Sequence, residues 1–150
     1  MFRGVSNLNL DSKGRMAMPT RYREAILEGC EGHMVMTVDF EACLLLYPQH
    51  EWMEIESKLV KLPSFNKQTR NLQRLLLGHA TEVDMDANGR ILIPPPLRVF
   101  AKMDKHIVLI GQGNKFELWN EETWNGGIDK MLDEGLDMDD LPDEVGSLSL

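Results

Sequence analysis

Apolar and polar residues follow a pattern that occurs twice along the chain. Residues 11–23 read DSKGRMAMPTRYR, and residues 86–98, at an offset of 75, read DANGRILIPPPLR. Residues 34–36 also match 107–109, and residues 44–52 match 116–124, at offsets of 73 and 72. Two copies are too few for a solenoid, so the pattern predicts a pseudo-dimer whose two halves pack against each other.

The repeated segment Asp-x-x-Gly-Arg has the chemistry of a tight turn between two strands. In the first copy it follows a loosely alternating stretch at residues 5–10. An aspartate that begins a turn accepts a hydrogen bond from the backbone two residues on, and a glycine in fourth place tolerates a positive φ. We therefore predict a β-hairpin with a glycine bulge at Asp11–Gly14, with Arg15–Met18 as its return strand, and an equivalent turn at Asp86–Gly89.

Prolines and the spacing of apolar residues predict the other elements. Pro19 suits the first turn of a helix over about residues 20–27, which Gly29 would end. Trp52, Ile55 and Leu59 are spaced as the apolar face of a helix that Pro48 opens. The remaining predicted elements are strands 34–38 and 43–47, a helix over 66–77, strands 79–85 and 90–93, a short helix from Pro95, a hairpin over 106–119 and a helix over 121–132.

These elements predict an α+β fold, mainly β, with two related halves. We divide the chain into a first repeat at residues 1–62, a linking helix at 63–78, a second repeat at 79–134 and an acidic tail at 135–150. The tail lacks apolar periodicity, so we expect it to be poorly ordered. A hydrophobic share of 43% in 150 residues is enough for a packed core.

The net charge of −8 is distributed unevenly along the chain. Residues 129–150 contain eight acidic residues and one lysine, a net charge of −7. The first 23 residues contain five basic residues and one aspartate, a net charge of +4. The basic end favours an anionic partner such as nucleic acid, which the overall acidity alone would disfavour.

Several other patterns are weak candidates for chemistry. Residues 84–89, DMDANG, begin like a calcium loop, but Pro95 stands where that loop needs a bidentate glutamate. Cys30, His33 and Cys43 lack an evident fourth zinc ligand, and both cysteines suit free thiols in a reducing cytoplasm. No nucleophile has a base placed beside it, so we predict no enzyme activity, no cofactor, no metal and no small-molecule substrate. The lack of a long apolar run and of a signal sequence predicts a cytoplasmic protein without membrane contact.

The two copies of the turn differ in charge. Lys13 lies in the first turn, and Arg21 and Arg23 follow it, whereas the second copy has Asn88 and retains only Arg98. The first copy therefore carries the cations that suit a phosphate or the edge of a guanine, which an arginine contacts bidentately. This difference predicts double-stranded DNA as the partner of the first turn.

A family resemblance is carried by the segments MFRGVSNLNLDSKGRMAMPTRYR (1–23) and DANGRILIPPPLR (86–98) and by the hairpin and helix after each. These segments closely resemble the MraZ proteins, bacterial regulators of the division and cell wall gene cluster. The resemblance covers about residues 1–145. It implies two tandem AbrB/SpoVT-like swapped-hairpin repeats that form a pseudo-dimeric β-barrel with outer helices. It also implies a nucleoid-associated homo-oligomer, a ring of eight or more protomers. Such a ring binds G-rich direct repeats in promoters, including the promoter of its own gene, and acts mainly as a repressor.

The resemblance also implies which residues form the site. The two copies of the family's motif fall on Asp11, Gly14 and Arg15, and on Asp86, Gly89 and Arg90. The first copy is the implied DNA contact, with Arg15 at its centre, Lys13 beside it and Arg3 on the preceding strand. Arg21, Arg23 and Arg90 are weaker DNA-binding candidates, and the role we prefer for Asp86, Gly89 and Arg90 is structural.

Two alternatives stay open. AbrB-like barrels also serve as antitoxins, and the acidic residues 129–150 would suit a basic protein partner. Lys67, Arg70 and Arg74 share one stripe of the predicted linking helix. This stripe is a solvated face, a second DNA contact or a contact with a neighbouring subunit.

Overall fold

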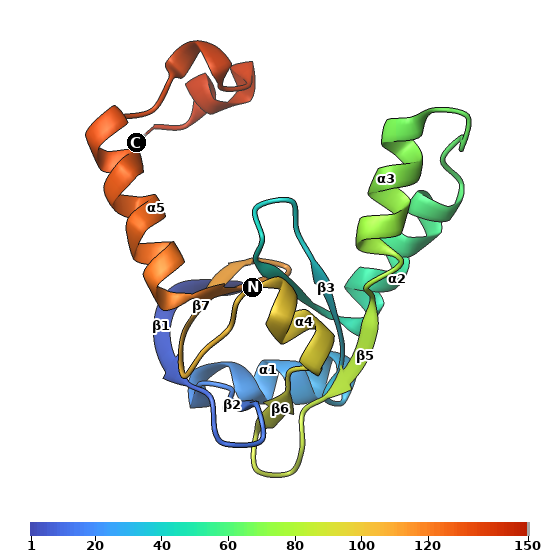
Figure 1. The fold of residues 1–150 in the computed structure, drawn as a ribbon, viewed down its shortest axis with the longest axis vertical. Helices are drawn as coiled ribbons and strands as arrows, with labels where there is room; N and C mark the ends of the chain where they lie inside the picture. The colour runs from blue at the N-terminus through green and yellow to red at the C-terminus, as the bar shows by residue number, and fades with distance from the viewer. Residues whose placement is uncertain (150) are drawn as a thin grey trace.

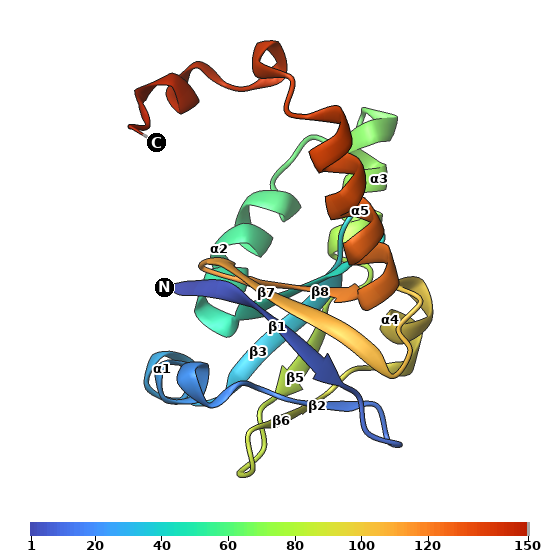
Figure 2. The same cartoon turned by 90° about the vertical axis from the view of Figure 1, so that its left-hand side faces the viewer.

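The computed structural model describes residues 1–149 as an α+β fold with an antiparallel sheet at its centre. The strands are β1 Phe2–Asn9, β2 Arg15–Ala17, β3 His33–Val38, β4 Leu44–Pro48, β5 Thr81–Asp84, β6 Arg90–Leu92, β7 His106–Gly113 and β8 Phe116–Asn120. The α-helices are α1 Thr20–Cys30, α2 Gln49–Val60, α3 Lys67–Leu76, α4 Pro95–Phe100 and α5 Glu121–Glu134. Figures 1 and 2 show α3 and α5 at one end of the molecule and the turns after β1 and β5 at the other.

The six-stranded sheet exchanges one strand between the two halves of the chain. Its strand order is β1-β7-β8-β4-β3-β5. β1, from the first half, pairs only with β7 from the second, and β5, from the second half, pairs with β3 from the first. The sheet therefore consists of two trios, each with one strand from the opposite half, joined where β4 pairs with β8.

This exchange corrects the simple hairpin that the turn chemistry predicted. The turn itself is present, because the Asp11 amide donates to the Arg15 carbonyl at 3.0 Å. Beyond the turn, however, β2 leaves β1 and pairs with β6, in the register Arg15↔Leu92 to Ala17↔Arg90. The swapped pairing that the family resemblance implies is thus the observed one, and the local hairpin prediction was wrong beyond the turn.

The two-stranded ribbon of β2 and β6 connects the two edges of the large sheet. β2 follows the edge strand β1, and β6 follows the opposite edge strand β5. In place of a closed barrel, the described residues therefore form an open six-stranded sheet and a two-stranded ribbon that connects its edge strands. The core lies between them, and the four methionines of the predicted strands are all buried there: Met16, Met18, Met34 and Met36.

Both faces of the strands β3 and β4 are buried. Alternate residues enter the main core, including Met34, Met36 and Leu46, while Val35, Leu45 and Tyr47 form a second cluster with Trp52 and Leu59 of α2. This outcome confirms the apolar stripe that the sequence predicted for α2. The second repeat has the same aromatic contact, because the rings of Trp119 and Trp124 lie 5.7 Å apart, as do those of Tyr47 and Trp52.

The helices follow the predicted positions, with differences of up to three residues at their ends. α1 does not end at Gly29 but continues to Cys30, because Glu31 adopts the left-handed conformation and its amide donates to Leu27. α3 begins after Asn66, whose side chain caps the amides of Gln68 and Thr69. After α5, residues 138–140 and 143–147 form short 3-10 helices, and the disorder of the tail stays a prediction. Within residues 1–149, no helix has the length and apolar character that crossing a bilayer requires.

Candidate nucleic-acid interface

The first turn, Asp11–Gly14, is held by the side chain of its own aspartate. Asp11 Oδ1 accepts hydrogen bonds from the amides of Lys13 and Arg15, both at 2.9 Å. Asp11 Oδ2 accepts from Arg15 Nε at 2.7 Å. Gly14 has a φ of +83°, a conformation that costs glycine little and other residues much. These bonds fix the direction in which the strand leaves the turn and the base of the Arg15 side chain.

The second turn, Asp86–Gly89, repeats this arrangement with a looser ion pair. Asp86 Oδ1 accepts from the amides of Asn88 and Arg90 at 2.9 Å, as in the first turn. Arg90 Nε lies 3.4 Å from Asp86 Oδ2 and has no hydrogen-bond acceptor among the described residues. The Asp–Arg pair is therefore structural in both turns, and it is tighter in the turn that the sequence assigned to DNA.

The hydrogen bonds favour the ionised form of both aspartates. The Arg15 amide, with the Arg15 guanidinium, lowers the pKa of Asp11 from 3.8 to about 2. The Arg90 amide, followed by that of Asn88, also lowers the pKa of Asp86. Both turns thus keep their carboxylate acceptors throughout the physiological pH range.

Each turn is fixed to the opposite repeat. The Ile93 amide donates to the Gly14 carbonyl at 3.0 Å, and the Met18 amide donates to the Gly89 carbonyl at 2.8 Å. The Leu10 amide, just before the first turn, donates to the Lys105 carbonyl at 2.8 Å. The two turns protrude together at the end of the molecule away from α3 and α5 (Figures 1 and 2). Their relative position is therefore set by backbone contacts.

The basic residues predicted to contact DNA lie at different depths. Lys13 is exposed in the first turn, and Arg3 is exposed on β1. The Arg15 side chain is 27% exposed, and the Arg90 side chain is 35% exposed. Since the two arginines are similarly placed, the charge difference between the turns comes from Lys13 and its uncharged counterpart Asn88.

The two arginines of α1 are engaged with the protein. Arg21 donates to the Ser6 hydroxyl at 2.5 Å and to the Tyr22 hydroxyl at 3.0 Å, and its guanidinium lies 4.5 Å from the Tyr22 ring centroid. Arg23 Nε donates to the Met18 carbonyl at 2.7 Å, and the side chain packs against Gly89 of the second turn. These contacts give both arginines a structural role, and their contact with DNA stays a prediction.

Arg98, which the sequence did not mark as a site residue, lies against the first turn. It packs against Gly14 as Arg23 packs against Gly89, so a Cβ on Gly14 would lie 2.3 Å from Arg98 Nη1. The repeat indicates this residue, because Arg98 follows Arg23 at the same offset of 75 residues that relates the two turns.

The basic stripe of α3 lies on another part of the molecule. Arg70 donates to the Ser64 carbonyl at 2.8 Å, and Arg74 donates to Asn71 Oδ1 at 3.4 Å. α3 stands at the end opposite the two turns, as does the acidic segment after α5 (Figure 1). One flat DNA contact therefore does not include both the first turn and Lys67, Arg70 and Arg74.

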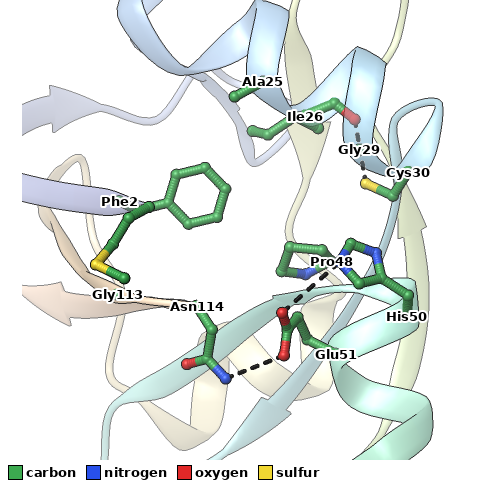
Figure 3. A pocket seen from close by; sticks show the side chains of 11 residues that line it. Phe2, Ala25, Ile26, Gly29, Cys30, Pro48, His50, Glu51, Gly113 and Asn114 are labelled. Atoms are coloured by element: carbon green, nitrogen blue, oxygen red, sulfur yellow. Dashed lines mark hydrogen bonds and ion pairs between the residues drawn. The ribbon is translucent and has the colours of Figure 1, made fainter.

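A small apolar hollow lies beside Phe2 near the N-terminus (Figure 3). It has a volume of about 280 Å³, and its lining includes Phe2, Ile26 and Cys30. On its rim, Asn114 donates to Glu51 at 3.2 Å. Burial raises the pKa of the Cys30 thiol, and its sulfur lies 3.2 Å from the Ile26 carbonyl oxygen, so this cysteine is a packed thiol and not an activated one. Among the described residues, no three His, Cys, Asp or Glu side chains gather as a metal site would need.

Comparison with known proteins identifies close relatives. Residues 1–75 and 76–140 each match the family described as "MraZ protein, putative antitoxin-like". A protein of Thioalkalivibrio sulfidiphilus is 60% identical over 134 residues, 89% of each chain. A protein of Methylococcus capsulatus is 54% identical over 151 residues, which cover 99% of each chain. A protein of Alkalilimnicola ehrlichii is also 54% identical over 151 residues, which cover 100% of each chain. All three relatives carry the name "Transcriptional regulator MraZ".

Proposed function

The chain belongs to the MraZ family, and from this premise we propose that it is a DNA-binding transcription regulator. It binds G-rich direct repeats upstream of its own gene as a ring of protomers, and it represses the division and cell wall gene cluster that begins there. Its partner is double-stranded DNA in the nucleoid.

The observation that carries this proposal is the difference between the two turns. They share the same aspartate acceptors, the same left-handed glycine and the same fixation to the opposite repeat. Only the first presents an exposed lysine, with the exposed Arg3 on the strand before it. A difference confined to exposed charge supports a contact with an anion, because folding does not require it.

The geometry suits the major groove of DNA. A turn between two strands is narrow enough to enter that groove, where guanine presents two acceptors to a basic side chain. Asp11 holds Arg15 through Nε, which leaves the two terminal nitrogens of the guanidinium to donate to the acceptors of a base. Lys13 adds a second charge at the tip, and Arg3 contacts a phosphate beside the groove.

One such tip buries little surface and binds weakly, at about micromolar Kd or above. A ring presents the same tip in every protomer, so each further contact becomes intramolecular. Avidity of this kind raises affinity by roughly 10²–10⁴ when successive DNA boxes match the spacing of the tips. Protomers arranged head to tail suit direct repeats, as a two-fold dimer suits a palindrome.

A second function is favoured by the acidic end of the chain. Residues 129–150 carry a net charge of −7, and within residues 129–149 all but Leu141 and Val145 are exposed. This segment lies at the end of the molecule away from the turns (Figure 2). This charge suits a basic protein partner, as in an antitoxin. A protein encoded next to this gene that binds the full chain, but not a variant lacking residues 135–150, would support this function.

The decisive experiment measures binding to the DNA upstream of the gene by gel shift at several salt concentrations. Lys13→Ala and Asn88→Ala change equivalent positions in the two turns, so they form a matched pair. A base contact is worth about 1–3 kcal/mol, so Lys13→Ala should weaken binding about tenfold or more, and Asn88→Ala should leave it unchanged.

Arg15→Ala and Arg90→Ala extend the test to the paired arginines. Arg15→Ala should abolish specific binding, whereas Arg90→Ala should first reduce solubility or assembly. Unchanged binding by both Lys13→Ala and Arg15→Ala would overturn the assignment of the first turn to DNA.

A further inference from the structure

Arg98 of α4 reaches across to the first turn from the second repeat. A Cβ built on Gly14 would lie 2.3 Å from its Nη1, 2.4 Å from its Cζ and 2.8 Å from its Nε. The guanidinium therefore covers the glycine of the turn that carries Lys13. Arg98, Asp104 and Lys105 line a hollow of about 420 Å³ together with the turn residues Asp11, Ser12 and Gly14.

The donors of Arg98 are unused, although the side chain is half-buried. Its Nε is buried and has no acceptor, and among residues 1–149 no hydrogen bond or ion pair involves its guanidinium. Arg23, the equivalent residue of the first repeat, covers Gly89 in the same way but donates from Nε to the Met18 carbonyl at 2.7 Å. Arg90 Nε also lacks an acceptor, but the Asp86 carboxylate lies 3.4 Å from it, whereas among the described residues Arg98 has no ion-pair partner. A half-buried guanidinium without an acceptor is costly, so the comparison points to a missing anionic partner at Arg98.

The two carboxylates in the hollow do not supply that partner. Asp11 already accepts three hydrogen bonds, from the Lys13 and Arg15 amides and from Arg15 Nε. Asp104 Oδ1 accepts from the Lys105 amide at 2.8 Å and forms no ion pair with Arg98. Arg98 and Lys105 of the second repeat thus line one hollow with Ser12 and Gly14, the two neighbours of the exposed Lys13 in the first turn.

We infer that Arg98 binds the phosphate backbone of DNA next to the groove that the first turn enters. The inference rests on the proposed function and adds a residue of the second repeat to its interface. The guanidinium fork matches two oxygens of one phosphate, which fixes the register of the turn on the duplex without reading sequence. The second repeat then contributes to DNA binding through α4, and not through its own uncharged turn.

A phosphate contact differs from a packing role in its dependence on salt. Each phosphate contact releases counterions. The plot of log affinity against log salt concentration has a negative slope, and the loss of one contact makes that slope less steep by about 0.9. Loss of packing alone weakens binding without changing that slope. A phosphate contact also affects specific and unrelated DNA alike.

The test variant is Arg98→Met, which keeps an unbranched stem over Gly14 and removes the charge. Lys58→Met, on an exposed position of α2, is the matched control for the loss of one positive charge. Binding is measured between about 50 and 200 mM salt on the upstream DNA and on a scrambled duplex of equal length. Thermal unfolding and the size of the oligomer are measured in parallel.

We expect Arg98→Met to bind both duplexes about tenfold more weakly, with a slope reduced by about 0.9 for each engaged protomer. Lys58→Met should match the wild type. If Arg98→Met does not fold, Arg98→Gln keeps hydrogen-bond donors without the charge and should show the same reduction in slope. A slope equal to that of the wild type overturns this inference alone, whereas a wild-type protein that binds neither duplex overturns the proposed function as well.

Discussion

The backbone of the edge strand β1 lies close to Gly111 of β7, and a methyl group there should displace the strand. In the register of β1 and β7, Gly111 stands opposite Gly4. A Cβ at Gly111 would lie 2.4 Å from the Arg3 nitrogen, 2.7 Å from the Arg3 Cα and 2.8 Å from the Phe2 carbonyl carbon. These are backbone atoms, so no change of rotamer relieves the contact.

The cost of Gly111→Ala follows from these distances. Non-bonded heavy atoms attract best at about 3.5–4.0 Å, so β1 has to move by about 1 Å. Overpacking of this kind costs about 1–3 kcal/mol, and the weakening of a neighbouring ladder hydrogen bond adds about 1 kcal/mol. We therefore expect a loss of about 2–4 kcal/mol from the free energy of unfolding, a large part of the roughly 5–15 kcal/mol of an ordinary domain.

Urea unfolding at a fixed protomer concentration measures this loss, since assembly makes stability depend on concentration. Gly127→Ala is the control, because Gly127 lies in α5 and a Cβ there meets nothing within 4 Å. Alanine in an exposed helix should stabilise by about 0.5–1 kcal/mol. A loss below about 0.5 kcal/mol for Gly111→Ala would show that β1 does not approach β7 as described.

The remaining predictions concern pH and the exchange of strands. The hydrogen bond that His33 Nδ1 donates to Asp84 Oδ1, 2.9 Å long, and the charge of that carboxylate raise the pKa of His33 above 6.5. Protonated His33 stabilises the fold at pH values below its ordinary pKa of 6.5, and this stabilisation is lost as pH rises through the raised pKa of the folded state. The difference in thermal midpoint between the wild type and His33→Gln should therefore shrink above pH 6.5. A difference that grows with pH would contradict the pairing of His33 with Asp84. Residues 1–62 alone should not fold as a monomer, because β1 and β3 lose their partners β7 and β5. Circular dichroism and sedimentation test this, and a stable monomeric fragment would refute the exchange.

Local chemistry made the turns predictable, while the partners of their strands were not. An aspartate, a glycine and an arginine at fixed spacing determine the hydrogen bonds of Asp11 and Asp86 almost completely. That spacing does not determine whether β2 pairs with β1 or with β6, because both pairings leave the same apolar residues facing the core. Only the resemblance to a family implied the exchanged strands.

The candidate site divides in the same way. Lys13 and the charge difference between the turns could be predicted, because they depend on single residues within a recognisable motif. The position of Arg98 depends on the packing of α4 against a turn from the other half of the chain. Contacts of this kind have no local signature, and only the repeat offset from Arg23 connected the two residues.

The exchange of strands explains where the two repeats are free to differ. Gly14 and Gly89, and likewise Arg23 and Arg98, each contact the opposite repeat, so a change at any of them alters both halves of the fold. Lys13 and Asn88 are exposed, and a change there alters only what the turn can bind. A chain built in this way can therefore make one turn basic and leave the other uncharged without cost to the shared framework. The framework also keeps the uncharged turn at a fixed distance from the basic one, so that, under the proposed function, each protomer presents a single basic tip to DNA.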